Sequence, residues 1–193
     1  MSDKDRGWDQ RYSEDAHGPS QPDDFLLRAW NEHILPRFPV PGSALDVAGG
    51  LGRHALWVAS QGWQVTLVDS SEVAIARAQA AAAQRGLMLN AVAADLRRYE
   101  LGNSRFHVIL VFFYLERALF PALENALCPG GILLYKTYTR EQLRFAGGPR
   151  NPEHLLTPGE LGRAFPRLQV LDHRETLTER AVAEFAGLRP VQA

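Results

Sequence analysis

The sequence predicts an α/β fold built on a mostly parallel sheet of seven strands, with helices on both faces and an antiparallel last strand. From residue 43 onward, short apolar segments alternate with helical ones, which is typical of a parallel sheet. Near the C-terminus, two strand-like segments, 168–177 and 180–189, follow each other with no helix between them. Their connection is too short for a parallel crossover, so we expect an antiparallel hairpin.

The remaining elements follow from apolar periodicity and from residues that typically begin or end helices. Ser71 is a good N-cap, and Gly62 and Gly86 end the helices before them. The segment 106–115 is almost entirely apolar, as expected of a central strand that is buried on both faces. We expect the other strands at 44–48, 64–69, 87–95 and 132–139, and helices at 53–61, 71–85 and 118–127.

The N-terminal region differs from this alternating pattern. Residues 13–24 are rich in Pro, Gly and Asp, which disfavours both helix and strand. The segment 23–38 follows it and reads as a helix that ends at Pro36. We therefore expect one domain over 1–193, with an N-terminal cap segment and helix over 1–40 and the alternating core over 43–193.

The composition is that of a cytoplasmic globular protein. Hydrophobic residues make up 46% and charged residues 22%, and the formal net charge is −1. With no basic surplus to neutralise phosphates, we expect no nucleic-acid partner. A single cysteine, Cys128, excludes an internal disulfide and fits a reducing compartment. The polar N-terminus is not a secretory signal, and no apolar run is long enough to span a bilayer, so no membrane partner is expected.

A glycine-rich turn joins the first strand of the core to its first helix. Gly50-Leu51-Gly52-Arg53-His54-Ala55 matches the loose dinucleotide pattern G-x-G-x-x-G/A. Asp46 lies in the preceding strand, however, where a carboxylate would repel a pyrophosphate and favour a ligand with an ammonium and a sulfonium group. The loose pattern leaves a nicotinamide-dependent oxidoreductase as the alternative function for this turn, and Asp46 argues against it.

From about residue 43 to the C-terminus, the chain resembles the class I S-adenosylmethionine-dependent methyltransferases. The family turn D/E-x-G-x-G-x-G corresponds to Asp46, Ala48, Gly50 and Gly52, with alanine in place of the first glycine. The segments 113–139 and 148–161 are closest to the small tellurite-resistance-type (TehB-like) methyltransferases. The resemblance implies a Rossmann-like sheet and the cofactor S-adenosyl-L-methionine, which becomes S-adenosylhomocysteine after transfer.

The resemblance also implies which residues bind the cofactor. In the family, the acid that ends the second strand, here Asp69, accepts both ribose hydroxyls, and the acid that ends the third strand, here Asp95, is near the adenine. These residues also have structural alternatives. Asp69 and Asp95 can each cap a helix, the glycines can serve only to form the turn, and Phe112 can be a core residue. The expected cofactor-binding residues are Arg11, Asp46, Ala48, Gly49, Gly50, Gly52, Asp69, Ser70, Asp95, Leu96 and Phe112.

The expected activity is methyl transfer to a small-molecule acceptor, with a non-catalytic S-adenosylmethionine-binding protein as a further alternative. The signature of amino methylation on nucleic-acid bases is missing, because the corresponding strand end reads FFYL. No metal-ligand spacing is present, so we expect no metal. In-line transfer needs no dedicated nucleophile, and any general base comes from the candidates Tyr114, Glu116, Tyr138 and His154.

The long segment 137–161 is the expected acceptor loop, because it leaves the carboxyl end of a strand and exceeds the usual length of such connections. Within it, Arg150 lies between Pro149 and Pro152, which restrict the backbone. We expect Arg150 to contact an anionic group of the acceptor. The alternative is that Arg150 braces the loop and the other arginines of this segment are solvated.

Overall fold

The computed structural model describes residues 9, 12 and 21–191. Its contacts divide the chain into two compact units, Met1–Glu100 and Leu101–Ala193. The single domain expected over 1–193 stays a prediction. In the described part of the chain, no helix is both long and apolar enough to cross a membrane.

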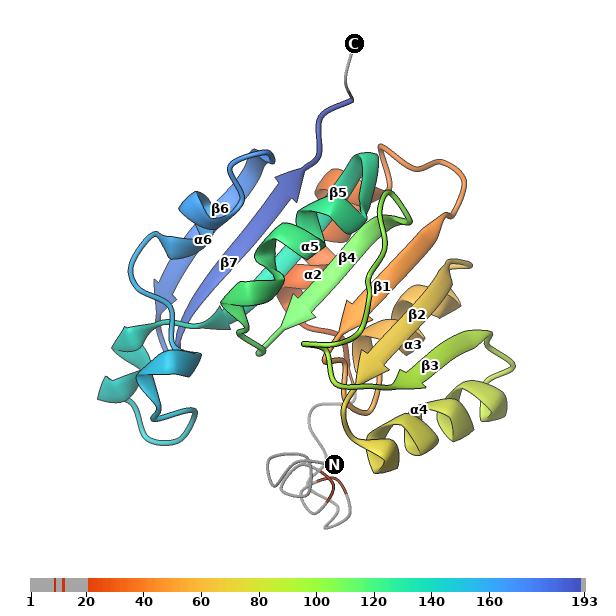
Figure 1. Cartoon of the computed structure of the whole chain (residues 1–193), viewed down its shortest axis with the longest axis horizontal. Coiled ribbons are helices and arrows are strands. Elements are labelled where there is room, and N and C mark those ends of the chain that lie inside the picture. The colour runs from red at the N-terminus through yellow and green to blue at the C-terminus, as the bar shows by residue number, and fades with distance from the viewer. Residues whose placement is uncertain (1–8, 10–11, 13–20, 192–193) are drawn as a thin grey trace. The chain divides into compact units, whose positions relative to one another are not determined.

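The first unit contains three parallel strands with helices between them (Figure 1). Strand β2 pairs with both β1 and β3, so the order within this unit is β3-β2-β1. Its elements in chain order are α2 (Asp24–Ala29), the π-helix η1 (Trp30–Ile34), β1 (Ser43–Val47), α3 (Arg53–Ser60), β2 (Gln64–Asp69), α4 (Glu72–Gln84) and β3 (Leu89–Ala93).

Local sequence signals account for most of these boundaries. The hydroxyl of Ser71 accepts a hydrogen bond from the N–H of Ala74 at 3.1 Å, so Ser71 is the N-cap of α4 as predicted. Helix α2 continues into a π-turn at Trp30, whose ring meets the edges of Trp57 and Trp63 in the core. Strand β3 is shorter than the predicted 87–95, because the chain turns at Asp95, whose carbonyl accepts from the N–H groups of Arg98 and Tyr99.

The second unit contains four strands in the order β4-β5-β7-β6 (Figure 1). Strands β4 and β5 are parallel, whereas β7 is antiparallel to both β5 and β6, so the predicted hairpin is confirmed. The elements in chain order are β4 (Phe106–Phe112), the 3₁₀ helix η2 (Arg117–Leu119), α5 (Phe120–Ala126), β5 (Leu127–Tyr138), the 3₁₀ helices η3 (Arg140–Arg144) and η4 (Pro152–His154), α6 (Glu160–Ala164), β6 (Gln169–Leu177) and β7 (Ala181–Leu188).

The seven strands have the order β3-β2-β1-β4-β5-β7-β6, which confirms the predicted mixed α/β sheet. The last strand does not lie at the edge. Residues 181–187 of β7 are all buried, because this strand lies between β5 and β6, while β6 is partly exposed along its whole length. The apolar sequence of β7 and the charged sequence of β6 follow from these two positions.

Three non-glycine residues of the described chain have left-handed backbone conformations: Ala48 (φ 54°), Ser104 (φ 49°) and Phe113 (φ 58°). Ala48 directly follows β1, where the family turn has glycine, and its N–H donates to the carbonyl of Val68 at 2.8 Å. An L-residue pays about 1–2 kcal/mol for this conformation. Ala48 therefore carries strain at the first residue of the glycine turn.

Ala48→Gly should make the protein about 0.5–1 kcal/mol more stable to urea. The substitution relieves the left-handed strain, and the greater freedom of glycine in the unfolded chain offsets part of that gain. The control is Ala80→Gly at an exposed position inside α4, which should cost about 1 kcal/mol. Equal losses of stability in the two variants would show that Ala48 is not strained.

Candidate functional site

The glycine turn between β1 and α3 has a backbone that only small residues permit. Gly50 and Gly52 have φ values of 55° and 77°, and the N–H of Gly52 donates to the carbonyl of Gly49 at 2.9 Å. At Gly49 the limit is space, because an added Cβ would lie 2.2 Å from Cδ1 of Leu67 and 2.6 Å from Oδ2 of Asp46. The turn therefore packs directly against the end of β1 and against β2.

Asp46 is a charged residue in the core of the first unit. Its side chain is completely buried, and Oδ2 accepts a hydrogen bond from the N–H of Ala55 at 3.1 Å. Oδ1 is buried and has no hydrogen-bond partner among the described residues. Burial raises the pKa of Asp46 to about 7; the bond from Ala55 opposes this rise and the negative charge of Asp69 adds to it. A buried carboxylate oxygen without a partner is costly, and a bound cation would offset that cost.

Asp69, the last residue of β2, forms hydrogen bonds with both the glycine turn and the start of α4. One carboxylate oxygen accepts from the N–H of Gly50 at 2.8 Å, and the other accepts from the N–H of Ser71 at 3.0 Å. Burial raises its pKa, while these backbone N–H groups oppose the rise. The N–H of Ser70 is a third backbone donor to this carboxylate. Because a carboxylate has about four acceptor sites, Asp69 keeps acceptor capacity for a ligand.

Asp95, the residue expected near the adenine, follows β3. Asp95 is half-buried, and its carboxylate accepts from the N–H of Arg97 and pairs with the guanidinium of Arg97 at 3.1 Å. These contacts hold the pKa of Asp95 below its usual value. Leu96 is buried, and Ser70, between β2 and α4, is half-buried. Asp95 therefore caps its own turn, which is the structural alternative that the sequence left open.

Two residues of the N-terminal segment lie against the glycine turn and α4. The hydroxyl of Ser71 donates to the carboxylate of Asp9, and the guanidinium of Arg77 donates to the carbonyl of Tyr12 at 2.6 Å. A Cβ added to Gly50 would lie 2.5 Å from the hydroxyl oxygen of Tyr12. Arg11, expected to bind the cofactor, lies outside the described residues.

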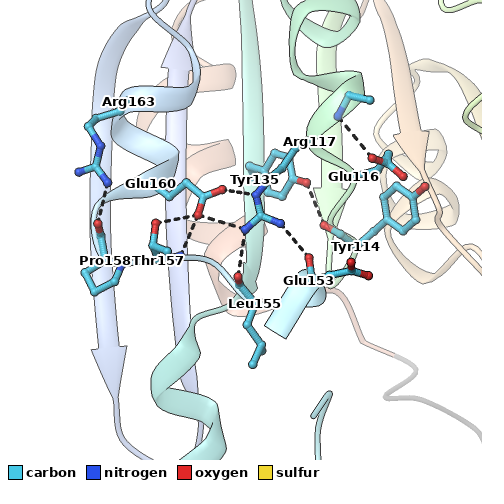
Figure 2. A network of polar contacts seen from close by, with 11 residues as sticks. Tyr114, Glu116, Arg117, Tyr135, Glu153, Leu155, Thr157, Pro158, Glu160 and Arg163 are labelled. Atoms are coloured by element: carbon cyan, nitrogen blue, oxygen red, sulfur yellow. Dashed lines mark hydrogen bonds and ion pairs between the residues drawn. The ribbon is translucent and has the colours of Figure 1, made fainter. Parts of the chain in front are cut away.

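The candidate catalytic residues of the second unit lie after β4, at the end of β5 and at the end of η4. Phe112 ends β4 and is buried, and Tyr114 accepts a hydrogen bond on its carbonyl from the hydroxyl of Tyr135 at 2.9 Å (Figure 2). Glu116 is the N-cap of η2, and His154 is the exposed last residue of η4. The role of these residues in catalysis stays a prediction.

Arg150 makes its contacts within its own loop. Its guanidinium donates to the carbonyl of Leu143 at 3.0 Å and to that of Phe145 at 2.9 Å, and its side chain remains exposed. These contacts correspond to the bracing role that was the alternative to acceptor binding. Gln142 holds the same loop to β7, because its buried side chain accepts from the N–H of Ala181 at 2.8 Å.

Sequence reasoning missed Arg117, which organises the loop after β5 (Figure 2). Its guanidinium donates to the carboxylate of Glu160 at 2.6 Å, to the carbonyl of Glu153 at 2.8 Å and to that of Leu155 at 3.0 Å. Burial raises the pKa of Glu160, but the bonds from Arg117 and Thr157 outweigh it and hold that pKa below its usual value. The partners of Arg117 lie 36 to 43 residues away, so no local signal in the sequence identifies this contact.

Residues 44–131 match the family model of the methyltransferase domain. This match confirms the predicted resemblance to the class I S-adenosylmethionine-dependent methyltransferases. S-Adenosylmethionine is the cofactor that this match supports, and the match gives no support to the nicotinamide-dependent alternative for the glycine turn.

Solved structures of methyltransferases have the same fold. TehB from Haemophilus influenzae aligns with a TM-score of 0.72 and 16% identity over 94% of this chain and 67% of that one. The N-methyltransferase NodS from Bradyrhizobium japonicum, solved with S-adenosylhomocysteine, aligns with a TM-score of 0.73 and 15% identity over 98% of this chain and all of that one. The predicted Rossmann-like fold and the resemblance to TehB-like methyltransferases are confirmed.

Curated relatives include two RNA-modifying enzymes. The ribosomal RNA small subunit methyltransferase C of Alcanivorax borkumensis is 35% identical over 56% of this chain. The tRNA 5-carboxymethoxyuridine methyltransferase of Escherichia coli K12 is 28% identical over 59% of this chain. The matches span 35% and 51% of the lengths of these two relatives.

These relatives correct the expectation of a small-molecule acceptor and no nucleic-acid partner, because both are named for RNA substrates. The small-molecule acceptor was expected because the amino-methylation signature is missing. The absence of a nucleic-acid partner was expected from the net charge of −1, which is a sum over the whole chain. Nucleic acids respond to the local arrangement of cations, and a few arginines on one face are sufficient in a protein with no basic surplus.

Gly50→Ala should lower the melting temperature more than Gly86→Ala does. Both glycines have positive φ, but an added Cβ meets the Tyr12 hydroxyl at Gly50 and nothing within 4 Å at Gly86. The overlap at Gly50 costs about 1–3 kcal/mol beyond the shared strain, and each kcal/mol lowers the melting temperature by about 2–4 °C. Removing the hydroxyl with Tyr12→Phe should recover part of the difference. Equal melting temperatures for the two alanine variants would contradict this contact.

Asp46→Asn should become more stable relative to the wild type as the pH rises from 5 to 8. Because the folded pKa of about 7 lies above the unfolded value of about 3.9, folding favours the neutral carboxyl. The contribution of the Asp46 carboxyl to the free energy of unfolding is therefore fully present below about pH 4. It is lost as the pH rises through the folded pKa of about 7. Melting temperatures of the ligand-free protein at four pH values test this, with the exposed Asp24→Asn as control. Parallel curves for wild type and Asp46→Asn would show that Asp46 does not titrate in this range.

Proposed function

We propose that this chain transfers the methyl group of S-adenosylmethionine to a nucleotide of RNA. The observation that carries the proposal is the combination of a methyltransferase domain over 44–131 with two curated relatives named for ribosomal RNA and tRNA. Since the matches span about a third and a half of these relatives' lengths, their complete activities are not transferred to this chain.

The buried carboxylate of Asp46 supports cofactor binding at the glycine turn. One of its oxygens is buried without a hydrogen-bond partner among the described residues, and its pKa of about 7 reflects that environment. A ligand that brings positive charge to this turn would favour the ionised form of Asp46. S-Adenosylmethionine carries an ammonium and a sulfonium group, whereas a dinucleotide would bring a pyrophosphate.

Asp69 is proposed to accept the ribose hydroxyls with the acceptor capacity that the backbone donors Gly50, Ser70 and Ser71 leave available. Its two backbone hydrogen bonds fix the carboxylate before the ligand arrives, so binding requires little ordering of this side chain. The proposed contacts of the described chain with the cofactor are therefore those of Asp46, Ala48, Gly49, Gly50, Gly52, Asp69, Ser70, Asp95, Leu96 and Phe112.

The cofactor, when bound, supplies a methyl group activated by its sulfonium. The protein then needs to hold the acceptor in line with that methyl group and to exclude water. Arg117 contributes indirectly, since it fixes the loop after β5 through Glu153, Leu155 and Glu160. If the acceptor atom carries a proton of high pKa, Tyr114 and His154 are the proposed bases, and Arg150 is the proposed contact for an anionic group.

Transfer of a tritiated methyl group to RNA tests the proposal. The purified chain is incubated with labelled S-adenosylmethionine and separate fractions of bacterial tRNA and ribosomal RNA, and the expected product is acid-precipitable and sensitive to ribonuclease. Asp69→Asn should weaken S-adenosylhomocysteine binding at least about tenfold and transfer with it, because charge-assisted hydrogen bonds of about 1.5–3 kcal/mol are lost.

Asp172→Asn is the matched control, since Asp172 lies on β6 and pairs with Arg174. It should retain both binding and transfer. Calorimetry on folded Asp69→Asn separates cofactor binding from chemistry. A chain that binds S-adenosylhomocysteine but labels neither RNA fraction would refute an RNA acceptor and favour the non-catalytic alternative.

A further inference from the structure

The residue that follows β4 has a strained backbone and a half-buried aromatic side chain. Phe113 has a φ of 58°, and its N–H donates to the carbonyl of Lys136 in β5 at 2.7 Å. A bulky residue rarely occupies the left-handed region, and such outliers are most often found at functional sites. A glycine would make the same turn without strain, so the side chain of Phe113 is the part of this residue that needs a role.

The ring of Phe113 is paired with a second aromatic ring. The ring centroids of Phe113 and Tyr138 are 5.2 Å apart, with an angle of 45° between their planes. Tyr138 is the last residue of β5, and β4 and β5 are parallel neighbours, so the two rings lie at the carboxyl ends of adjacent strands. Both side chains are only half-buried. The pair is therefore accessible from solvent at the edge where α/β sheets usually bind ligands.

Two cations lie within reach of the Phe113 ring. The guanidinium carbon of Arg180 is 5.8 Å from the ring centroid, and Nζ of Lys136 is 5.9 Å from it. Lys136 is neutralised by Glu184, its neighbour on β7, at 3.0 Å. Arg180 is exposed in the turn between β6 and β7, and within the described part of the chain no carboxylate pairs with it. The positive charge that remains for a ligand is therefore that of Arg180.

We propose that Phe113 and Tyr138 form a stacking platform for an unpaired base of RNA, and that Arg180 contacts the phosphate or an acidic substituent of the same nucleotide. The inference rests on the proposed function and names the residues that select its substrate. Proteins recognise single-stranded RNA by stacking splayed bases on aromatic rings and by contacting the backbone with arginine. An aromatic pair beside an arginine without a carboxylate partner provides both contacts.

This arrangement favours an unpaired base over a base within a duplex. An aromatic ring can only stack on a base whose face is free, and bases inside a helix already stack on their neighbours. We therefore infer that the substrate is a loop or an end of an RNA, with the target nucleotide turned out of any helix.

Binding of a fluorescein-labelled single-stranded oligouridylate of about 15 nucleotides, measured by anisotropy in the presence of S-adenosylhomocysteine, tests the platform. Phe113→Leu keeps the side chain apolar but cannot stack, and it should weaken binding at least about fivefold. Phe113→Tyr should restore binding. Arg180→Ala should weaken binding by a similar factor and reduce the salt dependence by about one phosphate contact.

Matched controls are Phe145→Leu, a half-buried aromatic in the loop after β5, and Arg85→Ala, an exposed arginine at the end of α4. Both should bind the oligonucleotide as the wild type does, and all variants should keep their affinity for S-adenosylhomocysteine. An abasic chain of the same length should bind more weakly. Equal binding of the abasic chain, or equal affinities for Phe113→Leu and wild type, would overturn the platform.

The methyl-transfer assay keeps this inference separate from the proposed function. If Phe113→Leu methylates RNA as the wild type does, the platform is wrong and the RNA methyltransferase stands. If the platform variants lose RNA binding but the wild type labels no RNA, the proposed reaction is wrong and the RNA-binding site stands.

Discussion

The carboxylate of Asp69 holds together the part of the first unit on which cofactor binding depends. It accepts one hydrogen bond from Gly50 in the glycine turn and one from Ser71 at the start of α4, so the turn and the helix are joined at a single side chain. Ser71 in turn caps α4 through Ala74 and donates to Asp9. The turn between β1 and α3 and the connection between β2 and α4 are therefore both bonded to the carboxyl end of β2.

Asp46 adds a second constraint, because a buried carboxyl beside another buried carboxyl is unfavourable when both are ionised. Burial is the main cause that raises the pKa of Asp46 to about 7, and the negative charge of Asp69 is a smaller one. The close packing of Gly49 against Asp46 and Leu67 leaves no room for a larger residue at that position. Strain at Ala48 and an unpartnered oxygen on Asp46 are thus concentrated at one turn, as is common where a protein binds a ligand.

The second unit uses a different device to arrange its loops. Arg117 bonds to backbone carbonyls of the segment after β5 and to Glu160, and Gln142 fixes the same segment to β7 (Figure 2). A guanidinium with several donors in a fixed plane suits this task, because it bonds to several acceptors at once. Arg150 serves its own loop in the same way, through the carbonyls of Leu143 and Phe145.

Local patterns in the sequence determined the alternation of strands and helices, the cap at Ser71, the positive-φ glycines of the turn and the C-terminal hairpin. These features depend on residues a few positions apart, whose spacing can be read directly. Tertiary structure alone decided that Asp69 bonds the turn and that Arg117 meets Glu160. It also decided that Phe113 leaves β4 in a left-handed conformation, which ends that strand before the predicted residue 115. Contacts between residues 19 to 43 positions apart arise only when the strands are aligned, so composition and periodicity contain no signal for them.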